Sequence, residues 1–588
     1  MKKILLLFLL ILCFMPLSAF DIAKNGKAES AVIMTEDMTE AEKNAALEFV
    51  SYIKKITDAE LPVLNNPTDG NNIYFGQTET VKNILGDFDF ETLKSDGILI
   101  KSGKDYLIFS GDRPRGTLYA VYSYLKDNLG CRFFTPTEEK IPRKTRISVN
   151  GINTVYTPPF MSRESYFKVN LGHNDYKFFA KNKLNGHFNN IPDEWGGHIF
   201  IKGWCHTIPQ WLPVSKYGKD HPEWYAFENG KRDNESSEAN ICFTNKEMLE
   251  ELTKVVLDQV EANDEKVIVS VSQPDTRRWC HCPECEKLCG DLGNSGALLT
   301  VVNHIAREVK KKNPNAYVET LAYQWTRQTP NNIVPEDNVI IRLCDIECDF
   351  ASPLNSENNK DFYRDLIEWH NFTDSIYVWD YVVNYSNSHP VFADFHVLQK
   401  NMQIFRDNHG VAVFEEGDDF NWDTALIGLK AYLLAELMWN PDIDTDKVIK
   451  EYLDFYFGPA GGNVYDYLNV LTEATVREKP FLKCFNPGNT YLTAEDFIKA
   501  FDCLYRGMEK VKYNPKYRDR LKVQLYAHHF SLWQAPEAVI EKVTATGLLG
   551  VYDTREKFLK MYIPFSFAHN NSYGQYTVHI NDSSLYKY

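Results

Sequence analysis

The chain has 588 residues and a formal net charge of −16 at pH 7. Its length exceeds what one hydrophobic core usually holds, so roughly two to four domains are expected. The negative charge excludes nucleic acid as an expected partner, because phosphate binding needs a basic surface. Aromatic residues make up 14% of the chain, including 11 Trp. We expect several of these rings to contact a ligand and the others to be core.

The start of the chain has the pattern of a secretory signal peptide. Two lysines precede an apolar run over 4–15, Pro16 ends the run, and Ala19 fits the position before a cleavage site. The run is shorter than the roughly 20 residues that a membrane-spanning helix needs. We therefore expect residues 1–19 to be removed and the protein to be exported, periplasmic or extracellular, without a membrane span.

Residues 20–150 are predicted to form a small α/β domain. Apolar periodicity predicts a helix over 40–56, and a second helix follows Pro114 and ends at Gly130. Short segments rich in β-branched and aromatic residues predict the strands 31–35, 72–76, 97–101 and 106–110.

Three segments of this domain carry a family resemblance. The segments 115–122, 130–134 and 138–142 resemble the N-terminal domain that precedes the catalytic barrel in β-hexosaminidases and α-glucuronidases. The resemblance implies a catalytic domain as neighbour and does not by itself imply an activity.

Residues 158–441 repeat a strand followed by a helix. Continuous apolar runs predict strands buried on both faces at 267–272, 317–323, 339–343, 376–379 and 411–414, with weaker candidates at 161–167 and 184–190. Helices are expected over 297–311, 361–371, 395–408 and 424–439. The alternation favours an eight-stranded (β/α)8 TIM-like barrel. An open doubly wound sheet is the alternative, since no glycine-rich phosphate loop decides between the two.

Residues 442–588 are predicted to be mostly helical. Helices are expected over 446–457, 464–477, 494–511 and 518–534, and a tyrosine-rich tail over 573–588 closes the chain. This stretch carries no recognisable chemistry, so we interpret it as a C-terminal packing domain that leans over one side of the barrel.

Acidic residues follow the predicted barrel strands, where side chains reach the active-site mouth. Breaking a glycosidic bond needs two carboxyl groups, one protonated and one ionised. An acid in such a place can also cap the next helix or face water. The candidates, in order of preference, are Glu415, Asp380, Asp275 and Glu347.

Aromatic and histidine side chains near the same strand ends and on a long loop are candidates for sugar binding. These residues are Trp204, His206, Trp224, Tyr225, Tyr323, Trp379 and Tyr381. Long loops commonly line substrate sites. For the loop residues, a loop folded on its own aromatic rings is the alternative.

Cysteines cluster between 280 and 289. The chain has 12 Cys, and Cys13 lies in the predicted signal, which leaves an odd set of eleven that cannot all pair. Four sulfurs, those of Cys280, Cys282, Cys285 and Cys289, suit a structural zinc. Disulfides, with Cys344 and Cys348 as further partners, and free thiols are the alternatives. A four-sulfur site has no open position for water, so no cofactor is expected for catalysis.

A longer resemblance covers about 204–459. It rests on the blocks 221–225, 229–232, 242–245, 269–273 through the cysteine cluster, 294–297, 320–323, 342–348 and 379–382. The chain resembles the domain-of-unknown-function family 4838. The resemblance implies kinship with α-glucuronidases and hexosaminidases but supplies no settled catalytic residues.

Together these features predict an exported glycoside hydrolase that acts on O-glycosidic bonds of a polysaccharide or host glycan. Asp380 and Glu415 are expected to converge on one sugar-sized cavity as acid and base or nucleophile. The alternatives are a glycan-binding protein that kept the barrel without the chemistry, and a metal-dependent hydrolase centred on the cysteines. The sequence does not specify the oligomeric state.

Overall fold

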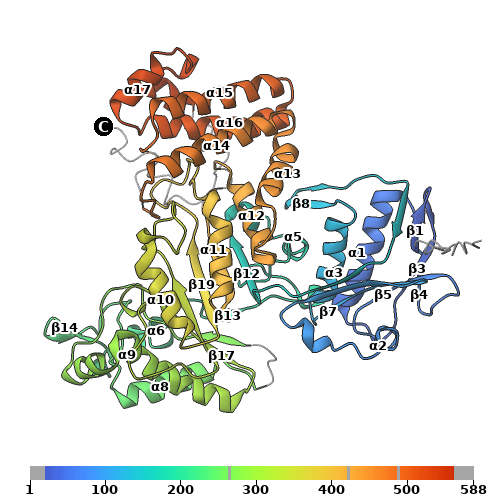
Figure 1. The fold of residues 1–588 in the computed structure, drawn as a ribbon. Helices are drawn as coiled ribbons and strands as arrows, with labels where there is room; N and C mark the ends of the chain where they lie inside the picture. Colours follow the sequence, from blue (N-terminus) through green and yellow to red (C-terminus); the bar gives the residue numbers. More distant parts are fainter. Residues whose placement is uncertain (1–19, 263–266, 420, 422–423, 486–489, 562–588) are drawn as a thin grey trace, which may run out of the picture. The chain divides into compact units, whose positions relative to one another are not determined.

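The structure is a computed structural model that describes residues 20–262, 267–419, 421, 424–485 and 490–561. The predicted signal peptide, with Cys13, and the tyrosine-rich tail lie outside the described residues. The chain divides into two compact units: 1–132, 140–157 and 193–196 form the first, and 133–139, 158–192 and 197–588 the second (Figure 1). In the described part of the chain, no helix has both the length and the apolar character needed to cross a membrane.

The first unit contains a six-stranded sheet. Its strand order is β11-β6-β7-β5-β3-β4, made of β3 (Ser30–Ile33), β4 (Val63–Leu64), β5 (Asn71–Phe75), β6 (Ile98–Ser102), β7 (Tyr106–Gly111) and β11 (Asn153–Tyr156). The four predicted strands are therefore confirmed within two residues at each end. A smaller sheet has the order β10-β1-β2, from Arg146–Val149, Phe20–Lys24 and Lys27–Ala28.

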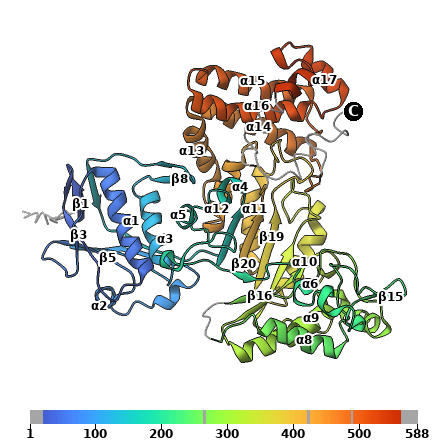
Figure 2. The ribbon, with the colours of Figure 1, turned by 180° about the vertical axis from the view of Figure 1, so that it is seen from behind.

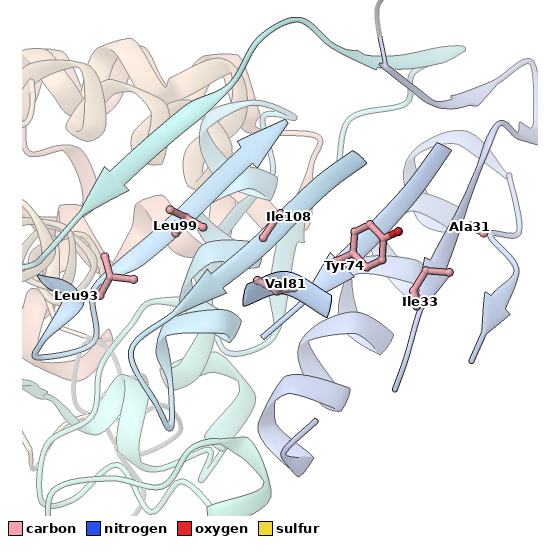
Figure 3. Packing of buried hydrophobic residues seen from close by; sticks show 7 residues of the cluster. All are labelled: Ala31, Ile33, Tyr74, Val81, Leu93, Leu99 and Ile108. Atoms are coloured by element: carbon pink, nitrogen blue, oxygen red, sulfur yellow. The ribbon is translucent and has the colours of Figure 1, made fainter. Parts of the chain in front are cut away.

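Both faces of the central strands of the six-stranded sheet are buried. Helices α1 (Glu40–Thr57) and α3 (Gly116–Asp127) contribute Phe49 and Tyr124, whose rings pack on Phe109 of β7. The opposite strand face packs with Val81 of α2 (Glu79–Leu85). Figure 3 shows that cluster: Ala31, Ile33, Tyr74, Val81, Leu93, Leu99 and Ile108. Successive residues of a strand point to opposite faces of the sheet. The side chains of β5, β6 and β7 therefore alternate between the layer with α1 and α3 and the layer with α2.

The second unit is organised around a parallel seven-stranded sheet. Its strand order is β12-β20-β19-β18-β17-β16-β13, and each neighbouring pair is parallel. The strands are β12 (Ser162–Tyr166), β13 (Ile201–Lys202), β16 (Ile268–Ser270), β17 (Tyr317–Ala322), β18 (Val339–Cys344), β19 (Ile376–Tyr381) and β20 (Gly410–Glu416). The apolar runs that predicted the five central strands are thus confirmed.

The predicted eight-stranded closed barrel is not confirmed in full, because the described residues form a parallel half-barrel sheet of seven strands. Strand β12 appears where 161–167 predicted it, but 184–190 forms no strand. This segment instead bridges the two sheet edges irregularly: Asn185 N donates to Arg163 O at 3.1 Å, and Ile199 N donates to Asn185 O at 2.8 Å. Phe188 N also donates to Glu164 Oε1 at 2.7 Å. Asn and Gly residues favour turns over a regular ladder, which accounts for the difference.

Helices follow the strands in the second unit. They are α8 (Lys246–Leu257), α9 (Pro283–Lys312), α10 (Lys360–His370), α11 (Phe395–Asp407) and α12 (Ile427–Trp439). Helix α9 begins fourteen residues before its predicted start at 297 and has a non-helical residue at Gly293. Nearly every residue of α12 is buried, as expected of a helix that packs against the sheet on one side and further helices on the other.

The C-terminal helices belong to the second unit rather than to a third. They are α13 (Thr445–Phe457), α14 (Gly461–Glu478), α15 (Ala494–Val511), α16 (Pro515–Leu532) and α17 (Glu537–Thr544). Helices α14, α15 and α16 lie side by side in both ribbon views (Figures 1 and 2). The predicted helices of this region are confirmed, and α15 has the predicted bounds.

Candidate active site

A cavity of about 350 Å³ lies at the carboxyl ends of the parallel strands. This volume falls within the range of about 300 to 1,000 Å³ that small-molecule sites occupy. The lining residues are Tyr166, Phe188, Trp204, Cys205, His206, Asp275, Leu321, Tyr323, Cys344, Ile346, Trp379, Tyr381, Tyr385, Phe414, Glu416 and Asp419. The strand ends of a parallel sheet are the usual place for a ligand.

Strand alternation decides which acids reach this cavity. Strands β19 and β20 run in register, with Asp380 opposite Glu415 and Tyr381 opposite Glu416. Both strands extend two residues beyond their predicted ends, so Asp380 and Glu415 lie inside strands instead of after them. Glu416 lines the cavity, whereas Asp380 and Glu415 do not. Since side chains alternate between faces, these two acids point to the opposite face of the sheet.

The structure therefore does not bring Asp380 and Glu415 to a shared open cavity, although the two are neighbours. They are 2% and 0% exposed and interact electrostatically with Asp394 and Lys430. Lys430 Nζ lies 2.5 Å from Asp394 Oδ1 and donates to Val382 O at 3.2 Å. We call Asp345, Asp380, Asp394, Glu415 and Lys430 the buried acid cluster. Burial raises the pKa of Glu415 well above its ordinary value.

Glu416 is the carboxyl group whose surroundings suit acid catalysis. Burial raises its pKa to about 7, although hydrogen bonds from Tyr385 and Trp379 lower it and the nearby Asp419 raises it further. Trp379 Nε1 donates to Glu416 Oε2 at 2.6 Å. A raised pKa favours the protonated carboxyl near neutral pH, and a general acid must be protonated.

Two other acids line the cavity. Asp275, an expected candidate, follows β16 at the other side of the sheet, is exposed, and hydrogen-bonds with Tyr323. Asp419 lies near Glu416, and burial raises its pKa although a hydrogen bond from Tyr166 lowers it. The cavity thus holds one partly buried acid pair, Glu416 with Asp419, and one exposed acid, Asp275, from the loop after β16.

An aromatic wall surrounds the acids. Trp204 and Trp379 lie 5.6 Å apart between ring centroids, and both pack edge-on against Phe414 at 4.9 Å. The buried guanidinium of Arg342 lies 4.3 Å from the Trp204 ring centroid and pairs with Glu319 at 3.1 Å. Arg342 therefore fixes the Trp204 ring from beneath the cavity.

The remaining predicted site residues separate into two groups. Trp204, His206, Tyr323, Trp379 and Tyr381 line the cavity. Glu347, Trp224 and Tyr225 do not. Glu347 forms an ion pair with Arg327 at 2.9 Å. Trp224 is buried and stacks on His221, and Tyr225 is buried with its hydroxyl donating to Leu212 O at 3.1 Å. For these two rings the alternative holds: the loop folds on its own aromatic side chains.

The cysteine prediction is corrected at one position. The sulfurs of Cys280, Cys282 and Cys285 gather with that of Cys242, and Cys289 is not part of the group. Cys242, Cys280, Cys282 and Cys285 do not line the cavity.

The sequence shows Glu416 among the acids after the strand 411–414, but Glu415 was preferred to it, and Asp419, Tyr385 and Tyr166 were missed as site residues. One signal could have identified Glu416. Trp379, Asp380 and Tyr381 were all expected in the site, yet three consecutive strand residues cannot share a face. Once Trp379 and Tyr381 are assigned to the cavity face, Asp380 belongs to the other face. The register then places Phe414 and Glu416, not Glu415, beside the two rings.

Solved structures with a similar fold are glycoside hydrolases. One is described as a novel family GH115 4-O-methyl-alpha-glucuronidase, BtGH115A, with specificity for decorated arabinogalactans. It is 9% identical, with a TM-score of 0.54 over 92% of this chain and 78% of that chain. Another, CpGH84B, is 10% identical, with a TM-score of 0.50 over 92% of both chains. At these identities the similarity establishes the fold, which is of the glycoside hydrolase type.

The chain belongs to the family described as Domain of unknown function (DUF4838), whose profile matches residues 133–469. A second profile, glycosyl hydrolase family 67 N-terminus, matches residues 12–124. The resemblance to family 4838 and to the α-glucuronidase N-terminal domain is therefore confirmed. No curated protein matches the chain significantly.

Proposed function

We propose that the protein is a glycoside hydrolase that cleaves an O-glycosidic bond of an oligo- or polysaccharide in the cavity, with Glu416 as general acid. The observation that carries the proposal is the environment of Glu416. Its carboxyl is buried against Trp379, is held by two hydrogen-bond donors, and has a pKa of about 7. A protonated carboxyl beside an aromatic ring can donate to the leaving oxygen of a sugar that packs on that ring.

Asp275 is the proposed second carboxylate, acting as base or nucleophile. It reaches the same cavity from β16, whereas Glu416 ends β20, so a sugar bound between them would meet the two acids from different sides. Glycosidases use two carboxyl groups that flank the scissile bond, and Asp275 is the cavity acid that does not adjoin Glu416. Asp419 is less suited to the role because it lies beside Glu416 and burial raises its pKa.

The charge of the lining supports a neutral sugar as substrate. Among the described residues that line the cavity there are three acids, Asp275, Glu416 and Asp419, and neither arginine nor lysine. A uronic acid would place its carboxylate beside these groups without a cation to pair with, which costs free energy in a partly buried site. The α-glucuronidase similarity therefore does not extend, in this proposal, to the substrate.

The test is hydrolysis of a panel of neutral and uronic acid glycosides by the wild type and three variants. We expect the neutral substrates to be cleaved, and Glu416→Gln and Asp275→Asn each to lose at least about 100-fold in kcat. Glu415→Gln is the matched control, because it makes the same chemical change at the next residue on the opposite strand face. We expect it to keep wild-type activity. Full activity in Glu416→Gln would refute the proposal.

A non-catalytic glycan-binding protein is the second candidate. The cavity contains more aromatic rings than acids, with Tyr166, Phe188, Trp204, Tyr323, Trp379, Tyr381, Tyr385 and Phe414 against three carboxyl groups. Stacking on such rings binds sugars without chemistry. Binding of a glycan by the wild type without any product release, across the whole panel, would favour this candidate.

A further inference from the structure

Four cysteine sulfurs from two segments of the second unit, Cys242 and residues 280–285, meet at one point. The Sγ atoms of Cys242, Cys280, Cys282 and Cys285 all lie within 4.8 Å of one another, and all four residues are buried. Cys242 follows the bridge between Tyr225 and Ile241, whereas Cys285 is in the first turn of α9. The fold therefore brings together thiols that the sequence separates by about 40 residues.

The distances between the sulfurs match those of a tetrahedral metal site. Cys242 Sγ lies 3.7 Å from Cys282 Sγ and 3.8 Å from Cys285 Sγ. With zinc–sulfur bonds of about 2.3 Å, two sulfurs of a tetrahedron lie about 3.8 Å apart. A disulfide would need about 2.05 Å. The four sulfurs are thus spaced to surround one ion rather than to bond in pairs.

The surroundings of the sulfurs suit thiolates. Phe227 N donates to Cys280 Sγ at 3.3 Å, and Arg232 Nη1 lies 3.7 Å from the same sulfur. The Thr244 hydroxyl lies 3.5 Å from Cys285 Sγ, within reach to donate. Hydrogen bonds to metal-bound ligands, and a positive charge beside them, orient the ligands and stabilise negative charge on sulfur.

We propose that Cys242, Cys280, Cys282 and Cys285 bind a structural Zn²⁺ ion. Thiolate is a soft ligand, and four thiolates in a tetrahedron favour zinc among the common divalent ions. Four protein ligands complete the tetrahedron and leave no position for water, so the ion is structural. Cys289, four residues after Cys285, is not a ligand.

The site would join the loop after β16 to the rest of the second unit. Asp275 lies in this loop, five residues before Cys280. On the other side of the loop, Trp325 Nε1 donates to Thr276 O at 3.0 Å, and the Trp279 and Trp325 rings stack at 5.3 Å. The ion would therefore anchor the segment that presents Asp275 to the cavity without touching the cavity itself.

The test compares metal content in the full-length wild type and two serine variants, purified without chelator. We expect about one zinc ion per chain in the wild type and in Cys289→Ser, and nearly complete loss in Cys242→Ser. Cys289→Ser is the matched control. It removes a thiol that is close to the other cysteines in the sequence but lies outside the group of four sulfurs. Replacement of zinc by Co²⁺ in the wild type should give the intense thiolate-to-cobalt absorption of a tetrahedral site.

A second measurement on the wild type alone does not depend on the folding of any variant. Thiols are alkylated in denaturant, with and without a chelator, before any reduction. We expect all four cysteines to react without reductant, with the chelator present to keep the released metal from the thiols. Alkylation of these cysteines only after reduction would show disulfides and overturn the proposal. Loss of zinc in Cys289→Ser with retention in Cys242→Ser would overturn the ligand set.

Discussion

Glu415 and Glu416 are consecutive residues with the same side chain, and their positions on opposite faces of β20 give them different chemistry. Glu415 is buried in the acid cluster, and neither of its carboxyl oxygens has a hydrogen-bond partner among the described residues. Glu416 accepts a hydrogen bond from Trp379 and reaches the cavity. Burial raises the pKa of both. Access to a substrate, rather than pKa alone, therefore distinguishes the candidate catalytic residue.

At this scale we predict the effect of Tyr385→Phe on the pH dependence of hydrolysis. A general acid must be protonated, so kcat should fall as pH rises through the pKa of Glu416, about 7. The Tyr385 hydroxyl lowers that pKa because its hydrogen bond favours the charged carboxylate. Removal of the hydroxyl should raise the pKa and move the basic limb to higher pH. The measurement is kcat between pH 5 and 9.

Tyr381→Phe is the control for this prediction. Tyr381 also lines the cavity, but it is not among the groups that shift the pKa of Glu416. We expect its basic limb to stay at the wild-type pH. A shift to lower pH in Tyr385→Phe, or the same shift in both variants, would contradict the role of the Tyr385 hydrogen bond.

A buried polar layer lies between the seven-stranded sheet and helix α12. Ser165 of β12 donates to Ala431 O of α12 at 3.0 Å, and Lys430 of the same helix projects toward the acid cluster. One lysine faces four acids there, and burial raises the pKa of Asp345 well above its ordinary value. The acids are accommodated largely because protonation removes their charge.

Lys430→Met should destabilise this layer. The substitution leaves Asp394 buried without its cation, which typically costs about 3 to 5 kcal/mol. Burial raises the pKa of Asp394 and Lys430 lowers it, so the variant's Asp394 should have a higher pKa still. A raised folded-state pKa stabilises at low pH and loses that contribution as pH rises. The loss in unfolding free energy should therefore be larger at pH 8 than at pH 5, as measured by urea unfolding.

The double variant Lys430→Met with Asp394→Asn is the control for this loss. Removing both charges removes the unpaired carboxylate, so most of the stability should return. An equal loss in the single and double variants, or a loss independent of pH, would show that Lys430 acts through packing rather than charge.

At the scale of the whole molecule, the C-terminal helices support the site as part of the second unit. Tyr385 N donates to Cys484 O at 2.6 Å, in the segment between α14 and α15. Phe350 N donates to Leu482 O at 2.9 Å, so the loop after β18 is held by the same segment. The expected packing role of this region thus includes contacts to the loop that carries Tyr385.

Much of this architecture could be predicted from sequence because its elements have strong local signals. Strands β17, β18 and β19 are mostly apolar and each contains one charged residue, and α15 begins with a capping box at Thr493. Two features had no such signal. Strand β13 has only two residues, and its hydrogen-bonded partner β16 lies more than 60 residues away. Cys242 joins its cluster only through the folded chain.

The candidate site was predicted less well than the fold, for a geometric reason. When the predicted end of a strand is two residues too early, the strand itself is still predicted. Acids that lie inside the strand are then taken to follow it. Asp380 and Glu415 were chosen in this way, whereas Asp275 follows its strand and does line the cavity. Side chains along a strand alternate between the two faces, so an error of one residue assigns a side chain to the wrong face. The same error hardly changes the prediction that a strand is present.

The central claim is that a glycosidic bond is cleaved beside Glu416. A crystal structure of Glu416→Gln soaked with an oligosaccharide that the wild type cleaves tests it most directly. We predict a sugar ring packed on Trp379, with its glycosidic oxygen about 2.6 to 3.2 Å from the side chain at position 416. An oligosaccharide bound outside this cavity, or with its glycosidic oxygen beyond reach of both position 416 and Asp275, would contradict the account.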